Sequence, residues 1–223
     1  MRRERNASQV LKEPFNAVSH AIGIVLALAG GAYLVLSSGG APWRAWSFVA
    51  FTLSSVGLFT SSTLLHAVRA RPRLEERLRR ADHAAIFVLI AGSYTPITLV
   101  SLRSAGSTWS WPLFLAVWVL ALAGVVFKLA WFHAPRWLST ALYLLLGWMA
   151  IAVLGPLARA LPPGGLALLA AGGVLYSVGA AVYALKRPDP APGVVGYHGL
   201  WHLFVLGGWG AHFALMAAYV LPS

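Results

Sequence analysis

Seven long apolar stretches, separated by short segments rich in polar residues, glycine and proline, constrain this chain more than any other feature. A stretch of about 20 apolar residues is long enough for a helix to cross the hydrocarbon core of a bilayer. Because backbone N–H and C=O groups find no water there, an α-helix, which pairs them internally, is the expected structure. We predict seven transmembrane helices with the approximate boundaries 16–37, 45–67, 84–102, 111–131, 137–157, 165–185 and 198–220.

The overall composition agrees with a membrane protein. Of the 223 residues, 59% are hydrophobic and 10% are charged, whereas soluble domains are about 45–50% apolar and about 25% charged. Seven spans leave almost no chain for a soluble domain. We therefore predict an all-α, polytopic membrane protein with a single domain, 1–223. The first apolar run, 17–36, is itself long enough to span, which favours a retained helix over a cleaved signal peptide.

The basic residues predict the orientation, because short loops rich in lysine and arginine stay on the cytoplasmic side of a membrane. One side receives only Arg44, Arg103 and Arg159. We therefore predict a cytoplasmic amino terminus, an external carboxyl terminus and a location in the cell membrane. The opposite, cytoplasmic side receives fourteen basic residues, namely Arg2, Arg3, Arg5, Lys12, Arg69, Arg71, Arg73, Arg77, Arg79, Arg80, Lys128, Arg136, Lys186 and Arg187.

These basic residues lie in short loops rather than on an extended soluble face, so the net charge of +11 does not indicate nucleic-acid binding. The run 69–80 also contains Glu75 and Glu76. It is interpreted either as a loop that sets the topology or as a short amphipathic helix on anionic headgroups. Lys128 lies one turn from the end of its span, from where we expect its side chain to reach the headgroups.

Four ionisable residues fall at the cytoplasmic ends of different predicted spans: His66, Asp82, His198 and His202. His198 and His202 are four residues apart, so they share a helix face, and His66 can complete a three-ligand site from another helix. The chain contains no cysteine, so histidine and carboxylate are the ligands available for a metal. Three imidazoles with an open fourth position are typical of catalytic zinc, and we predict that these histidines bind Zn²⁺.

Other polar residues lie near this proposed site. Ser62 is one turn before His66, and its hydroxyl can bond a ligand, a water or a substrate carbonyl. Asp82 can orient or deprotonate a water molecule. Interhelical hydrogen bonds are the simpler interpretation of each histidine. A second shell of polar residues is predicted at the start of the first span, where helix capping is an equally good interpretation: Glu13, Asn16, Ser19 and His20.

The remaining histidines are not predicted to be ligands. His212 lies ten residues after His202, about 15 Å deeper in the membrane at helical rise, so we expect it to bond another helix. His83 and His133 are predicted to lie at the membrane interface.

Three ordered motifs together resemble a known family. They are Glu13-x-x-Asn16-x-x-Ser19-His20-x-x-Gly23, Ser62-x-x-x-His66 followed by Asp82, and His198-x-x-x-His202 followed by His212. This pattern, which covers essentially the whole chain, resembles the hemolysin III group of the progestin and adipoQ receptor superfamily, which includes the adiponectin receptors. One departure is His83, where the eukaryotic receptors usually carry tyrosine. The long amino-terminal region of those receptors is also missing here, so a hormone-receptor role is not transferred.

The resemblance implies a seven-helix bundle with an intramembrane zinc held by His66, His198 and His202, with Asp82 and Ser62 beside the zinc-bound water. It also implies a link to ceramidase-like hydrolases of lipid amides and to membrane-lipid homeostasis. We therefore predict a zinc-dependent lipid hydrolase with a membrane lipid as substrate or ligand. Two alternatives remain at this stage: a non-enzymatic sensor of the membrane state with structural zinc, and a cytolytic, pore-forming protein.

Overall fold

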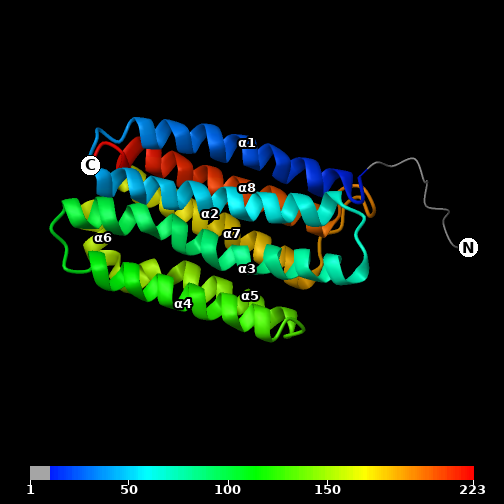
Figure 1. Ribbon diagram of the computed structural model, residues 1–223. Helices are drawn as coiled ribbons and strands as arrows, with labels where there is room; N and C mark the ends of the chain where they lie inside the picture. The colour runs from blue at the N-terminus through cyan, green and yellow to red at the C-terminus, as the bar shows by residue number, and fades with distance from the viewer. Residues whose placement is uncertain (1–10) are drawn as a thin grey trace, which may run out of the picture.

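The computed structural model describes residues 11–223, which form a bundle of α-helices (Figure 1). Seven helical segments in it are long and apolar enough to cross a membrane, as predicted from the sequence. The residues Arg2, Arg3 and Arg5 of the charge count lie outside the described part of the chain. The elements are α1 (Pro14–Leu36), α2 (Pro42–Ala67), α3 (Pro72–Pro96), α4 (Ser110–Ala130), α5 (Arg136–Gly147), α6 (Leu154–Ala160), α7 (Pro163–Leu185) and α8 (Tyr197–Leu215).

Three short helices of other types complete the spans. The π-helix η1 (Ile97–Leu102) extends α3, the 3₁₀-helix η2 (Trp148–Val153) joins α5 to α6, and the π-helix η3 (Met216–Val220) extends α8. Pro96 lies directly before η1. Because proline has no N–H to donate, a change from α to π hydrogen bonding is expected near it.

Proline marks the starts of four long helices. Pro14, Pro42, Pro72 and Pro163 are the first residues of α1, α2, α3 and α7. At this position the missing N–H would have had no partner within the helix, and the fixed φ angle of proline suits the helical backbone. The local sequence therefore sets where these four spans begin.

The third helix begins earlier than the span predicted at 84–102. It starts at Pro72 and includes most of the basic segment, which is thus neither a loop nor a separate amphipathic helix. Two ion pairs one turn apart stabilise this extension, Arg79 with Glu75 at 3.0 Å and Arg80 with Glu76 at 2.5 Å. An apolar window identifies the part of a helix that crosses hydrocarbon, so it misses a polar extension beyond the membrane.

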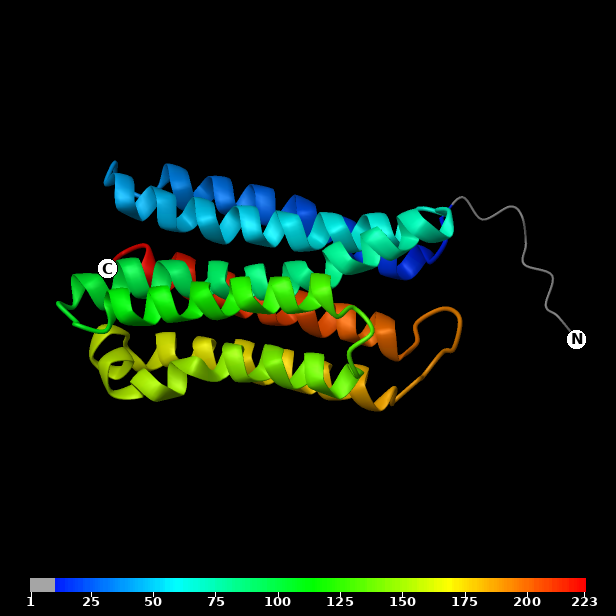
Figure 2. The same cartoon turned by 60° about the horizontal axis from the view of Figure 1, so that its bottom comes forward.

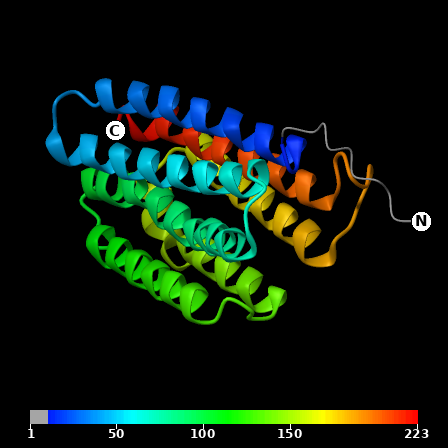
Figure 3. The ribbon, with the colours of Figure 1, turned by 45° about the vertical axis from the view of Figure 1, so that its right-hand side comes forward.

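The helices lie side by side, and α3 is the most buried of the spans. It packs against α2, α4 and α5, while α8 packs between α1 and α7 (Figure 3). Figure 2 shows α1 and α2 together on one side of the bundle and α5 and α7 together on the opposite side. The start of α1 and the α2–α3 and α7–α8 connections lie at one end, and the carboxyl terminus lies at the other (Figure 1).

The fifth span is interrupted at its centre, and Tyr94 of α3 binds the backbone there. Its hydroxyl donates to the carbonyl of Gly147 at 2.6 Å and accepts from the N–H of Ala150 at 2.8 Å. Unpaired backbone groups are costly in hydrocarbon, so a helix can be broken at this depth only where another residue satisfies them. Tyr94 therefore allows a change from α5 to η2 inside the bundle.

The first prediction concerns orientation. Reporter enzymes that work only outside the cytoplasm are expected to be active when fused after Ser223 and inactive when inserted at Pro192, in the α7–α8 connection. The two sites lie at opposite ends of α8, so each serves as the control for the other. Activity only at Pro192 would reverse the predicted orientation, and equal activity at both sites would contradict the seventh span.

The second prediction concerns the close contact between α2 and α3. A Cβ added at Gly92 would lie 2.6 Å from the Cβ of Ser54 and 3.1 Å from the carbonyl oxygen of Ala50. Gly92→Ala should therefore lower the free energy of unfolding by about 1–3 kcal/mol, measured as a lower thermal midpoint in detergent. Gly57→Ala is the matched control, since no atom lies within 4 Å of the added carbon. Equal stability of the two variants would contradict tight packing at Gly92.

Candidate metal centre

Three histidines meet at the end of the bundle where α1 begins. His66 is in the last turn of α2, while His198 and His202 are in the first two turns of α8. Their candidate ligand atoms all lie within 4.8 Å of one another. His66 and His202 are buried, with 4% and 1% of their surface exposed, and His198 is partly buried. The structure therefore brings together the three residues predicted as metal ligands.

Glu13 orients the imidazole of His66. The backbone N–H of Glu13 donates to the carbonyl of His66 at 2.9 Å, which fixes the start of α1 against the end of α2. The carboxylate oxygen Oε2 lies 2.7 Å from Nδ1 of His66 and also accepts from the amide of Asn16 at 2.8 Å. The hydrogen bond from His66 lowers the pKa of Glu13 from 4.5 to about 2. Because the ionised carboxylate can only accept, Nδ1 is the protonated nitrogen and Nε2 carries the lone pair.

Ser19 has the same role for His202. Its hydroxyl donates to the carbonyl of Asn16 at 3.0 Å and lies 3.2 Å from Nδ1 of His202. Since its proton is already used, the hydroxyl accepts from Nδ1–H, which leaves Nε2 of His202 as the free ligand atom. His20, also on α1, stacks on His202 with ring centroids 3.7 Å apart. Of the four residues predicted as a second shell, Glu13 and Ser19 thus bond two of the three imidazoles, Asn16 bonds Glu13, and His20 packs on His202.

The spacing of two of the candidate ligand nitrogens fits a tetrahedral metal ion. Nε2 of His66 and Nε2 of His198 lie 3.2 Å apart. A zinc–nitrogen distance of about 2.0–2.1 Å with a tetrahedral angle places two ligand nitrogens about 3.3 Å apart. Two lone pairs at this distance repel each other unless a proton or a cation lies between them. The set of three imidazoles, the spacing of this pair and the hydrogen bonds on Nδ1 of His66 and His202 suit zinc.

A cavity of about 570 Å³ extends from this cluster into the bundle. His20, His198 and His202 line it at the cluster, together with Ser62 and Asp82 from α2 and α3. The side chain of Ser62 interacts with the carboxyl group of Asp82. Both predicted catalytic residues therefore line the same cavity as two of the candidate ligands.

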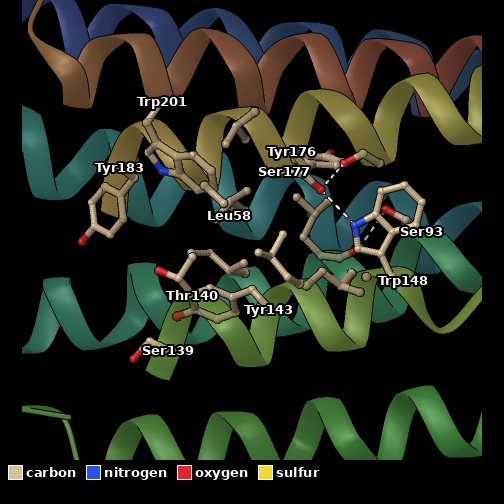
Figure 4. Close-up of a pocket in the computed structure, with 18 of the residues that line it drawn as sticks. Leu58, Ser93, Ser139, Thr140, Tyr143, Trp148, Tyr176, Ser177, Tyr183 and Trp201 are labelled. Carbon is tan, nitrogen blue, oxygen red and sulfur yellow. Dashed lines mark hydrogen bonds between the residues drawn. The ribbon is translucent and has the colours of Figure 1, made fainter. Parts of the chain in front are cut away.

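The body of the cavity is mostly apolar and crosses much of the bundle. Figure 4 shows Ser139 and Tyr183 at one end of the cavity and Trp148 at the other, where the indole of Trp148 donates to the hydroxyl of Ser177 at 2.9 Å. The lining on α7 extends from Leu166 to Tyr183, which corresponds to about 25 Å at helical rise. The cavity lining therefore follows most of the length of α7.

The sequence did not indicate that Lys128, His83 and His212 line this cavity. The prediction that the side chain of Lys128 reaches the headgroups is wrong. Lys128 is 3% exposed and lines the cavity, where its ammonium group donates to the hydroxyl of Ser139 at 2.9 Å. His83, predicted to be interfacial, also lines the cavity. His212 lies outside the metal cluster, as predicted, and packs edge-on against Tyr176 of α7. Only the packing of α3, α4 and α5 shows that Lys128 and His83 face inward.

This geometry defines a class of protein: a membrane protein of seven helical spans, with three histidines at one end of an internal cavity. The family model described as "Haemolysin-III related" matches residues 8–213, and the chain belongs to this family, as the sequence motifs predicted.

Two bacterial relatives are 38% identical to it. One is a hemolysin-3 homolog of Bacillus subtilis, aligned over 94% of this chain and 95% of the relative, and the other is hemolysin-3 of Bacillus cereus, aligned over 97% and 95%. A human relative, the monocyte to macrophage differentiation factor, is 25% identical over 93% of this chain and 84% of its own length.

Proposed function

We propose that this protein is a zinc-dependent hydrolase that cleaves an amide bond of a membrane lipid within the cell membrane. The observation that carries the proposal is the meeting of three histidines, a carboxyl group and a hydroxyl group at one end of a long apolar cavity. Ionisable residues at membrane depth are costly and are usually functional. The resemblance to the adiponectin receptors implies a link to ceramidase-like hydrolases, and this supports an amide bond as the target.

The residues divide the work of hydrolysis. His66, His198 and His202 would hold Zn²⁺, which polarises a carbonyl oxygen and lowers the pKa of water when bound. Asp82 takes a proton from the attacking water as its oxygen bonds to the carbonyl carbon. The same carboxyl group returns that proton to the amine nitrogen as the C–N bond breaks. Ser62 orients the carboxyl group of Asp82, and the apolar cavity holds the acyl chain and excludes bulk water.

A second function, a non-enzymatic sensor or regulator of the membrane state, is favoured by a different observation. The histidine cluster connects α2 to α8, and Glu13 and Ser19 connect α1 to both. A metal ion at this point would link the ends of three helices, which is what a structural zinc does. The two functions differ in the role of Asp82, which a structural metal does not need.

The third prediction tests the metal. Purified protein should contain about one zinc ion per chain by mass spectrometry of the metal content, and His198→Ala should lose most of it, since two imidazoles bind zinc weakly. The control is His133→Ala, an exposed histidine away from the cluster, which should retain the metal. A wild-type protein without stoichiometric zinc would contradict both functions.

The fourth prediction separates the two functions. Asp82→Ala should retain zinc but lower the rate of lipid amide hydrolysis by about 10²- to 10⁴-fold, the usual contribution of a general acid–base group. The measurement compares the lipids of cells carrying either form and the turnover of lipid amides by the purified proteins. Glu76→Ala is the control, because this carboxylate pairs with Arg80 outside the cavity. Unchanged lipid pools in a zinc-containing Asp82→Ala protein would favour the sensor.

A further inference from the structure

Lys128 is a buried cation inside a membrane-spanning helix, without a carboxylate beside it. Its ammonium group contacts the hydroxyl of Ser139 at 2.9 Å and lies 5.6 Å from the centre of the Phe132 ring. Neither partner carries a negative charge. Burying a cation inside a protein costs free energy unless an anion compensates its charge. A charge at membrane depth is costly for the same reason.

The carboxylates of the described chain, residues 11–223, are all used elsewhere. Glu13 binds His66, Glu75 pairs with Lys12 and Arg79, and Glu76 pairs with Arg80. Asp82 interacts with Ser62, and Asp189 accepts from the backbone N–H of Tyr197. No ion pair joins a carboxylate of this part of the chain to Lys128 or Arg136.

Lys128 and Arg136 line the same cavity as the histidine cluster, and Arg79 lines it with them. The guanidinium group of Arg136 lies 4.9 Å from the centre of the Tyr183 ring, which forms this end of the cavity in Figure 4 together with Ser139. His83 and His198 line the cavity as well. Positive charge from α3, α4 and α5 is thus concentrated at the end of the cavity that holds the metal centre.

We infer that this cavity binds an amphiphile whose anionic group, a phosphate or a carboxylate, contacts Lys128 and Arg136 while its chain fills the apolar body. Lysine and arginine are the residues that bind phosphate and carboxylate most strongly. The anion supplies the charge that the protein does not, and the cavity has the length and lining for an acyl chain. Orientation by positive loops explains why basic residues lie on this side, but not why Lys128 turns inward.

The identity of this amphiphile as a substrate rests on the proposed function, whereas its binding does not. An anionic group held beside His83 would place the neighbouring part of the lipid near His198 and Asp82. The predicted substrate class is therefore a lipid amide that carries a phosphate or carboxylate, rather than a neutral one.

The fifth prediction is tested by binding, without turnover. The zinc-containing protein in neutral maltoside micelles is titrated with lysophosphatidic acid, with lysophosphatidylcholine of the same chain length, or with inorganic phosphate, and bound ligand is counted by native mass spectrometry. Lysophosphatidic acid should bind at least about tenfold more tightly than the zwitterionic lipid, and inorganic phosphate should not compete at equal concentration. Lys128→Met should weaken binding of lysophosphatidic acid about 10- to 100-fold, as expected for a lost charge-assisted hydrogen bond.

Two further variants keep the test decisive. Lys128→Arg retains the charge and should keep the preference for the anionic lipid, which would assign the preference to the charge at this position. The thermal midpoint and zinc content of Lys128→Met should match those of wild type, which separates a loss of binding from a folding defect. Lys186→Met removes an exposed lysine outside the cavity and should bind like wild type. Equal affinity for the two lipids, or an unchanged affinity in Lys128→Met, would overturn the proposal. Full competition by inorganic phosphate would show that the site binds a free anion, which would overturn the proposal of an amphiphile. Absent hydrolysis alongside selective binding would overturn only the proposed function.

Discussion

Hydrocarbon provides no hydrogen-bond partner, so the helical backbone and many of the side-chain hydroxyl groups of the described residues pair within the chain. Helices pair the backbone groups of each span. Hydroxyl groups inside the spans donate hydrogen bonds to backbone carbonyls of the preceding turn. Ser55 donates to the carbonyl of Phe51 at 2.7 Å, and Thr98 donates to that of Tyr94 at 2.9 Å. Where the fifth span breaks, Tyr94 binds both sides of the interruption. The same constraint makes each buried group that lacks a compensating partner a sign of function.

The histidine cluster shows how this constraint prepares a metal centre. Glu13 and Ser19 lie at the start of α1, where the chain leaves the hydrocarbon, and they use the Nδ1 atoms of His66 and His202 as donors. Nε2 of His66 then lies 3.2 Å from Nε2 of His198, and one ligand atom from each of the three histidines lies within 4.8 Å of the others. A cation is the natural partner for several imidazole lone pairs directed at one point. The start of α1 therefore orients two of the three candidate ligands and contributes no candidate ligand itself.

The cavity has an apolar body and a polar, charged end, just as a lipid has an apolar chain and a polar headgroup. Its body is lined by apolar side chains from the centre of the bundle, and its end carries the cluster, Asp82 and the basic residues around Lys128. Lys128 points inward, and its ammonium group donates to the hydroxyl of Ser139 on the neighbouring α5 at 2.9 Å. A lysine near a span end can reach either the headgroups or the interior, and the packing of α4 against α5 decides between them.

The sequence by itself determined the helical class, the number of spans and the family, because apolar length and the ordered motifs are local properties of the chain. It also indicated which histidines share one end, since depth follows from topology. It misplaced the start of α3, because ion pairs such as Arg79 with Glu75 extend a helix beyond its apolar part. Only the tertiary structure decided that Glu13 meets His66, that the cavity reaches the cluster, and that Lys128 faces inward. These contacts join helices that are far apart in the sequence. The rotation of each helix about its own axis depends on its packing against other helices, which the sequence of one segment does not determine.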